Sequence, residues 1–165
     1  MRAGIIFLLG SLVIHSSALA QSPVRMTPPK APIATSVGVP AGSDIVFVSG
    51  TVPDSLEGSP ASFGDTETQT RSILSKIEAE LARHGMGLGD VVMMRVFLVA
   101  PKGQDRMDFA GMMKAYSERF GTAEQPNKPA RSTMQVAGLV HPDWLVEIEV
   151  TAARPAHSTP AGSPQ

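Results

Sequence analysis

The hydrophobic and polar positions of this chain form several strand-type segments and two longer segments with helical spacing. Together they predict the order strand, strand, helix, strand, helix, strand, strand. The strand-type segments are a possible short strand at 36–39, an apolar run closed by glycine at 45–50, a run at 91–99 interrupted only by Arg95, and period-two segments at 130–137 and 145–151. The run at 45–50 is typical of a buried strand. The last two segments flank a turn region with Gly, Pro and Asp, which predicts a β-hairpin or two neighbouring strands.

The first helical segment covers residues 66–84. Asp65 is a good N-cap, and Gly85 suits the position that follows the last turn of a helix. Apolar residues recur at every fourth position and predict the buried face: Ile73, Ile77 and Leu81.

A second helix is predicted from about Asp105 to Phe120, before a stop at Gly121. Its apolar stripe consists of Phe109, Met112, Met113, Tyr116 and Phe120. Such a stripe is more often part of a core than a contact with a cofactor.

Strands interleaved with two helices indicate a two-layer α+β domain, with both helices packed on one face of a small sheet. The opposite face of the sheet must then be covered as well. In a chain of this size we expect self-association to cover it.

The first twenty residues have the features of a cleavable signal peptide. Arg2 supplies a positive charge, an apolar core runs from Ile5 to Ile14, and small residues at Ala18 and Ala20 precede Gln21. The apolar core is too short to span a bilayer, although a retained membrane anchor is the alternative interpretation. We therefore expect cleavage after Ala20 and a periplasmic or secreted protein with no membrane attachment.

After this signal peptide at 1–20, we expect an extended lead-in at 21–32, one domain at 33–154 and a Pro-rich disordered tail at 155–165.

The chain carries 14 Lys and Arg against 15 Asp and Glu, without a basic cluster, so it has no electrostatic signature of nucleic-acid binding. It contains no cysteine, which excludes disulfides, thiol nucleophiles and thiolate metal sites. The histidines show no metal-ligand spacing, and we expect no metal or organic cofactor.

Charged residues on the last two predicted strands are the candidates for a functional site. Alternation places Arg131, Thr133 and Gln135 on one face of the first strand, and Glu147 and Glu149 on one face of the second. A plain half-buried strand needs only something polar at these positions, so a cation and two carboxylates indicate a site.

Some of these residues also have structural interpretations. Arg131 could form an ion pair with a strand glutamate, and Glu149 is as good a candidate as Glu147 for a solvated strand face. Ser49-Gly50 could be a strand end that needs a tight turn. Arg95 could be buried against a carboxylate or exposed at a sheet edge, and the single tryptophan is expected in the core or at an interface.

Several segments, in order and over about residues 33–153, resemble the RidA (YjgF) family. These segments are Phe47–Pro53, Glu67–Arg71, Leu88–Val92, Val96–Leu98, Asp108–Ala110, Ala115–Tyr116 with Phe120, Pro129–Thr133 and Val146–Glu149.

The resemblance implies a chorismate-mutase-like fold assembled as a homotrimer, with three sites in the clefts between subunits. Enzymes of this type hydrolyse reactive enamine and imine acids, such as 2-aminoacrylate, to 2-keto acids and ammonia without a metal or organic cofactor. The resemblance implies that Arg131 holds the carboxylate of a small substrate and that Glu147 is catalytic. It also implies that Ser49, Gly50 and Thr133 line the pocket.

Two positions depart from the family pattern. Ser36 stands where deaminating members carry a tyrosine, and Met113 stands where many members have asparagine. In addition, 2-aminoacrylate is made by cytoplasmic enzymes, whereas we expect this chain to be exported. Three hypotheses follow: an exported imine or enamine deaminase with altered substrate choice, a non-enzymatic trimer that binds a small carboxylate, and a chaperone-like trimer with a vestigial cleft. Endoribonuclease activity has also been attributed to relatives, but the acidic chain gives it little electrostatic support.

Overall fold

The computed structural model of the protein describes residues 21–59 and 62–156. The predicted signal peptide at 1–20 and all but the first two residues of the predicted tail lie outside the described residues. The elements, in chain order, are β1 (Val24–Met26), β2 (Ser36–Gly38), β3 (Ser43–Thr51), α1 (Thr66–Arg83), a 3-10 turn η1 (Leu88–Asp90), β4 (Val91–Leu98), α2 (Phe109–Ser117), β5 (Ala130–Gln135) and β6 (Val146–Pro155).

Four strands form a mixed sheet in the order β3-β6-β4-β5. β6 is antiparallel to both β3 and β4, whereas β5 is parallel to β4. The prediction that segments 130–137 and 145–151 are neighbours is wrong, because β4 lies between β5 and β6. α2 connects β4 to β5 as a crossover, which places β5 on one side of β4 and leaves the other side to β6.

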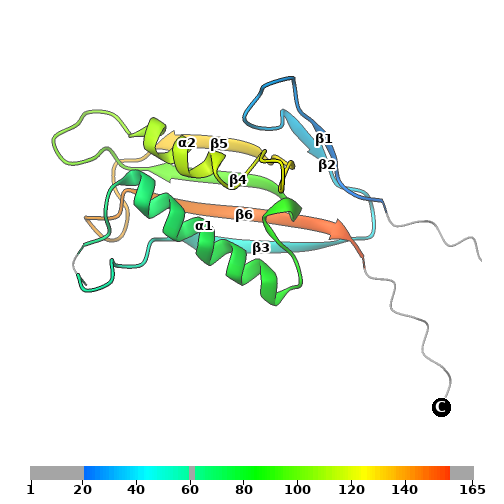
Figure 1. Cartoon of the computed structure of the whole chain (residues 1–165), viewed down its shortest axis with the longest axis horizontal. Coiled ribbons are helices and arrows are strands. Elements are labelled where there is room, and N and C mark those ends of the chain that lie inside the picture. The colour runs from blue at the N-terminus through cyan, green and yellow to red at the C-terminus, as the bar shows by residue number, and fades with distance from the viewer. Residues whose placement is uncertain (1–20, 60–61, 157–165) are drawn as a thin grey trace, which may run out of the picture.

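Both helices cover the same face of this sheet, as Figure 1 shows, which confirms the predicted two-layer α+β fold. The core lies between the two layers. β4 contributes Met94, Val96 and Leu98, and β6 contributes Val146 and Ile148, all of them buried. On both strands the intervening side chains point to the opposite face, which the helices leave uncovered.

The first helix forms as its sequence predicts. The carboxylate of Asp65 accepts a hydrogen bond from the backbone N–H of Thr68 at 2.8 Å, so Asp65 is the N-cap. Ile73, Ile77 and Leu81 are fully buried. Gly85 adopts a φ of 65°, and the N–H of Met86 reaches back to the carbonyl of Leu81.

The second helix is shorter than the predicted span from Asp105 to Phe120. Its N-cap is Asp108, whose carboxylate accepts from the N–H of Gly111 at 2.8 Å. The residues before it are held by Gln135 of β5 instead, which donates to the carbonyl of Asp105 and accepts from the N–H of Met107. A side chain therefore satisfies backbone groups that a longer helix would have used.

The apolar run at 45–50 is not the buried strand that its composition predicts. β3 lies at the edge of the sheet. Alternate side chains of this strand point to the face that the helices leave uncovered, and there Ile45 is 50% and Phe47 is 79% exposed. A continuous apolar run is consistent with burial on both faces, and in this chain the second face is open.

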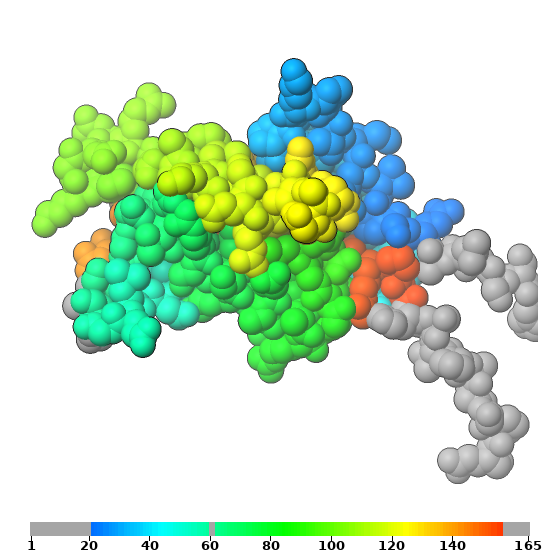
Figure 2. All heavy atoms as spheres, viewed as in Figure 1, coloured from blue at the N-terminus to red at the C-terminus, as the bar shows by residue number. Residues whose placement is uncertain are grey.

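The predicted lead-in at 21–32 contains the short strand β1, which pairs with β2. Arg25 of β1 donates to the carbonyls of Gly89 and Val91 at 2.9 and 3.3 Å, which fastens the two-stranded sheet to the start of β4. Figure 2 shows this blue N-terminal segment packed against the yellow segment that leads into β5, where Lys128 donates to the carbonyl of Ala31. Across the described residues, we find no helix with the length and apolar character needed to cross a membrane.

Candidate functional site

Arg131 lies on β5 beneath the second helix. It stands beside Met94 of β4 in the parallel register, and Met94 is buried under the helices, so Arg131 faces the same layer. Its guanidinium donates to Sδ of Met113 at 3.0 Å and lies 3.9 Å from Sδ of Met112. The guanidinium carbon lies 4.4 Å from the centre of the Tyr116 ring, a cation–π geometry.

The charge of Arg131 has no anionic partner within residues 21–59 and 62–156. Burial lowers the pKa of Arg131, and the electrostatic effect of the nearby Tyr116 acts in the opposite direction. Burial also raises the pKa of Tyr116 to about 12, and the charge of Arg131 acts against that rise. A half-buried cation without a counter-charge is costly, and a carboxylate that meets its planar fork would offset the cost.

The interpretation that Arg131 pairs with a strand glutamate is wrong. The strand ion pair is formed by Arg95, whose Nη1 lies 2.8 Å from Oε1 of Glu149 directly across from it on β6. Both residues lie on the uncovered face of the sheet. Glu149 therefore has a structural partner, which leaves Glu147 as the better catalytic candidate of the two.

Thr133 points to the same layer as Arg131, as the alternation predicts. Its hydroxyl oxygen is buried and has no hydrogen-bond partner in the described part of the chain. The next residue on that face, Gln135, is already engaged by the segment before α2. In the described residues, Arg131 thus has no carboxylate partner, and the neighbouring Thr133 hydroxyl has no hydrogen-bond partner.

Glu147 lies on the uncovered face, beside Phe97 of β4 and between the buried residues Val146 and Ile148. Its carboxylate occupies the space that a side chain at Gly50 would need, since a Cβ there would collide with Glu147. Ser49 and Gly50 lie inside β3, where the register with β6 shifts between Val48 and Thr51. They therefore form an irregularity within the strand rather than a tight turn at its end.

The five predicted site residues fall into two groups within one chain. Arg131 and Thr133 lie on the helix-covered face of β5, whereas Ser49, Gly50 and Glu147 lie on the uncovered face of β3 and β6. Ser49 also lines a depression of about 210 Å³ on that uncovered face. The structure brings the members of each group together and keeps the groups apart.

Sequence reasoning did not identify the residues that surround Arg131. Four members of the predicted apolar stripe contact or lie near the guanidinium, and they are Phe109, Met112, Met113 and Tyr116. Their spacing of three and four residues is also the signal of an ordinary core helix. Only the position of β5 beneath α2 shows that the stripe has a second role.

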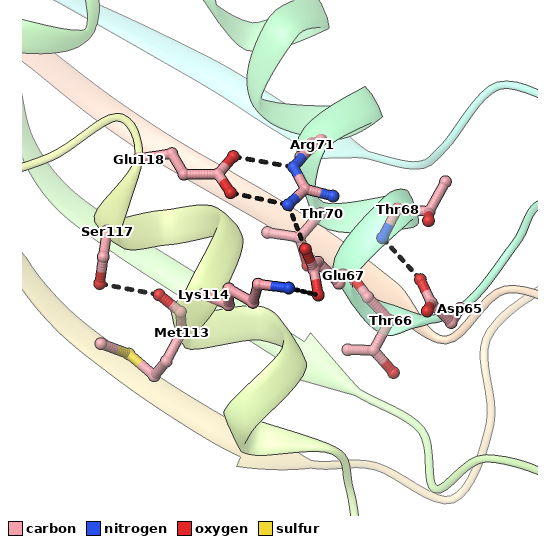
Figure 3. A network of polar contacts seen from close by, with 10 residues as sticks. All are labelled: Asp65, Thr66, Glu67, Thr68, Thr70, Arg71, Met113, Lys114, Ser117 and Glu118. Carbon is pink, nitrogen blue, oxygen red and sulfur yellow. Dashed lines mark hydrogen bonds and ion pairs between the residues drawn. The ribbon is translucent and has the colours of Figure 1, made fainter.

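An ion-pair network links the polar side of α2 to α1 (Figure 3). Arg71 of α1 donates to both carboxylate oxygens of Glu118 at 2.7 and 2.8 Å and also contacts Glu67. Lys114 of α2 lies 3.0 Å from Glu67. The polar residues of this network therefore contact α1 rather than Arg131.

Gln69 of α1 is a second residue whose role the sequence did not reveal. It is fully buried, accepts from the N–H of Leu145 at 2.7 Å, and donates to the carbonyls of Asp143 and Gly64 at 2.9 and 3.1 Å. These bonds hold the segment that leads directly into Glu147. Trp144 in this segment is partly buried, with its ring 5.4 Å from that of His141.

A metal site is not suggested by the described side chains, among which no three His, Asp or Glu residues are grouped closely enough to hold an ion.

Comparison with known proteins gives a consistent result. A family model described as Endoribonuclease L-PSP matches residues 28–154. The 3-aminoacrylate deaminase RutC of Acinetobacter baylyi is 36% identical over 126 residues, covering 76% of this chain and 90% of the relative. A RutC family protein of Pyrococcus abyssi is 37% identical over 109 residues, covering 66% of this chain and 78% of the relative.

Solved structures share the fold. The crystal structure of E. coli TdcF with bound serine has a TM-score of 0.55 and 32% identity, and the match covers 71% of this chain and 85% of TdcF. A YjgF family member from Neisseria meningitidis has a TM-score of 0.54 and 26% identity, and the match covers 83% of this chain and 98% of that protein. The match over most of the chain, together with the order of the strands and helices, shows that this protein belongs to the Endoribonuclease L-PSP family, also known as the RidA (YjgF) family.

Proposed function

We propose that this protein hydrolyses reactive 2-imino and enamine acids to 2-keto acids and ammonia. The enamine tautomerises to the imine, water adds to the imine carbon, and the carbon–nitrogen bond of the resulting carbinolamine breaks. One water is consumed, the carbon becomes a ketone, and the nitrogen leaves as ammonia. The similarity to a relative named as a 3-aminoacrylate deaminase supports this reaction class.

The observation that carries the proposal is the unpaired guanidinium of Arg131. It is half-buried, held over the ring of Tyr116, and has no carboxylate among the described residues. A substrate carboxylate would supply the missing charge through two parallel hydrogen bonds and would be oriented by them. Each charge-assisted bond of this kind contributes about 1.5–3 kcal/mol.

Glu147 is the proposed catalytic residue, positioned against β3 because Gly50 leaves room for its carboxylate. A carboxylate within hydrogen-bonding distance of the attacking water can orient that water and accept its proton. Holding the water and the imine carbon together also removes much of the entropic cost of their encounter.

Arg131 and Glu147 lie on opposite faces of the sheet within one chain, so one substrate can contact both only if they come from different copies. We propose a homotrimer in which the uncovered faces are buried and each site takes Arg131 from one subunit and Glu147 from its neighbour. The exposed Phe47 and Ile45 on that face support its burial in an assembly. We also propose that residues 1–20 are removed on export, so that the trimer works in the periplasm or outside the cell.

A second candidate function is a non-enzymatic trimer that binds a small carboxylate as a sensor, scavenger or chaperone-like module. The serine in the crystal structure of E. coli TdcF supports binding of a small amino acid by this fold. Ser36 in place of the family tyrosine also favours this function, because the pocket loses a hydroxyl and a ring wall. Ser36 is exposed at the start of β2, and Ala34, two residues before it, bridges to Ala130 of β5.

The test is to generate 2-imino acids in solution with an amino-acid oxidase and to follow their decay with and without the protein lacking residues 1–20. Under the proposal, the protein accelerates the decay and Arg131→Ala abolishes the acceleration. Arg131→Lys keeps the charge but loses the planar fork, so we expect it to retain only a small part of the activity. Arg83→Ala, a change at an exposed arginine of α1, serves as the control and should leave the rate unchanged.

The outcomes separate the two candidates. Binding of a carboxylate without faster imine decay would support the binding module and overturn the deaminase. A wild-type protein that neither binds nor accelerates would overturn both.

A further inference from the structure

We propose that Met113, together with Phe109, makes the Arg131 site selective for carboxylates that carry an uncharged, apolar chain. This inference rests on the proposed function, in which Arg131 holds the substrate carboxylate. It goes further by assigning the chemical class of the rest of the substrate.

The guanidinium of Arg131 is surrounded by one apolar stripe of α2. Phe109, Met112, Met113 and Tyr116 recur at intervals of three, one and three residues, which places them on one face of the helix. The sulfur of Met113 is 3.0 Å from Nη2 of Arg131, and the Phe109 ring centre is 5.9 Å from the guanidinium carbon.

The polar side chains of α2 are directed elsewhere. Lys114 pairs with Glu67 of α1, and Glu118, the residue that follows α2, pairs with Arg71 of α1 (Figure 3). Ser117 donates to the carbonyl of Met113 at 2.8 Å. Hence α2 offers no free polar side chain to a ligand that extends along it from Arg131.

Two of the stripe residues remain accessible to such a ligand. Phe109 is 43% exposed, and Met113 is only partly buried, whereas Met112 and Tyr116 are covered. A carboxylate on Arg131 would therefore place its chain beside the Phe109 ring and the Met113 thioether. A thioether is a weak hydrogen-bond acceptor and adapts readily to an alkyl group.

An asparagine at position 113 would behave differently. Its amide presents both donors and an acceptor beside the guanidinium, and these groups would form hydrogen bonds with a hydroxyl or another polar substituent on the ligand. Methionine cannot form these hydrogen bonds and offers the ligand an apolar contact instead. The substitution thus favours an alkyl chain over an isosteric hydroxylated one.

The test compares two probes that differ at one group, L-serine and L-2-aminobutyrate, in which a methyl replaces the hydroxyl. Serine is chosen because it is the amino acid bound in E. coli TdcF. Dissociation constants are measured by titration calorimetry for the wild type and for Met113→Asn, Met113→Leu and Arg131→Ala. We expect the wild type to bind L-2-aminobutyrate about tenfold more tightly, the usual scale for such a difference in an apolar pocket.

Met113→Asn should abolish or reverse the preference, whereas Met113→Leu should keep it, because leucine preserves the apolar wall. Equal binding of both probes to the wild type, or an unchanged preference in Met113→Asn, would overturn the inference while leaving carboxylate binding intact. Loss of both probes in Arg131→Ala is the expected result of the proposed function. A wild type that binds neither probe would overturn the inference, and the imine-decay assay then decides the proposed function separately.

Discussion

The guanidinium carbon of Arg131 lies 4.4 Å from the ring centre of Tyr116, so the cation of β5 rests on an aromatic face supplied by α2. The contact fixes the guanidinium through the delocalised ring rather than through a carboxylate. Because the positive charge is left without an anionic partner in the described structure, it is available to a ligand. Because the two groups are so close, the pKa of Tyr116 should also respond to the charge of Arg131.

Alkaline titration should detect this environment, since Tyr116 is the single tyrosine of the chain. Burial raises the pKa of Tyr116 from 10.0 to about 12 in the folded protein. A raised tyrosine pKa contributes stability that is fully present below pH 10 and is lost as the pH rises toward 12. Absorbance near 295 nm should follow the ionisation, and denaturant unfolding at several pH values should follow the stability.

The charge of Arg131 lowers the pKa of Tyr116, so Arg131→Met should move the titration to still higher pH in the folded protein. A tyrosine that titrates near pH 10 in the folded wild type would contradict the buried, stacked position. Unfolding the protein in denaturant provides the reference pKa.

Gly50→Ala should impair catalysis without a large loss of stability. The added Cβ collides with the carboxylate of Glu147, which must move away from β3. We expect imine hydrolysis to fall by about tenfold or more, in the range of losses from a misplaced acid–base group. The measurement is the oxidase-coupled decay assay, with thermal unfolding recorded in parallel.

Gly87→Ala is the matched control for that change, because a Cβ at Gly87 meets no atom within 4 Å. Its activity should equal that of the wild type. Full activity in Gly50→Ala would show that the position of Glu147 against β3 is unimportant for the reaction.

Gln69→Leu should destabilise the fold. The substitution leaves the N–H of Leu145 and the carbonyls of Asp143 and Gly64 without the partner that now satisfies them. Unsatisfied buried groups of this kind cost about 1–3 kcal/mol each, so we expect a total loss of about 2–4 kcal/mol because part of the segment can relax toward water. Urea unfolding measures the change.

Arg83→Gln provides the comparison for stability. Arg83 forms an exposed ion pair with Glu80 at 3.1 Å, and exposed pairs contribute at most about 1 kcal/mol. If Gln69→Leu were as stable as Arg83→Gln, the anchoring role of Gln69 would be wrong.

Phe47→Asp should disrupt the proposed trimer. Phe47 is 79% exposed in the single chain and lies on the uncovered face of the sheet. A carboxylate buried at that position in an interface would be strongly unfavourable, whereas in a monomer it would remain in water. Light scattering at micromolar concentration should give a trimer for the wild type and smaller species for Phe47→Asp.

A wild type that is monomeric at that concentration would refute the trimer. Lys102→Asp is a suitable control, since Lys102 is an exposed loop residue that lies outside the uncovered sheet face. It introduces the same side chain and should leave the trimer intact.

Local structure was largely predictable from sequence. The Asp65 cap, the buried positions of α1 and the glycine after it follow from short-range hydrogen bonds and helical periodicity. The limits of α2 were not predictable, because Gln135, far along the chain, captures the backbone before that helix. The exposure of Ile45 and Phe47 on β3 was not predictable either, since an apolar run does not show whether a second layer covers the outer face of the strand.

For the site, the sequence alone determined the chemical groups: a guanidinium, a carboxylate and an apolar helical stripe, each on a segment of known type. Only the tertiary structure decided that Arg131 and Glu147 face opposite sides of the sheet and that the stripe of α2 surrounds Arg131. The physical reason is that alternation fixes the relative sides of residues within one strand. The sides of two different strands are related only through strand order and register, which long-range packing sets.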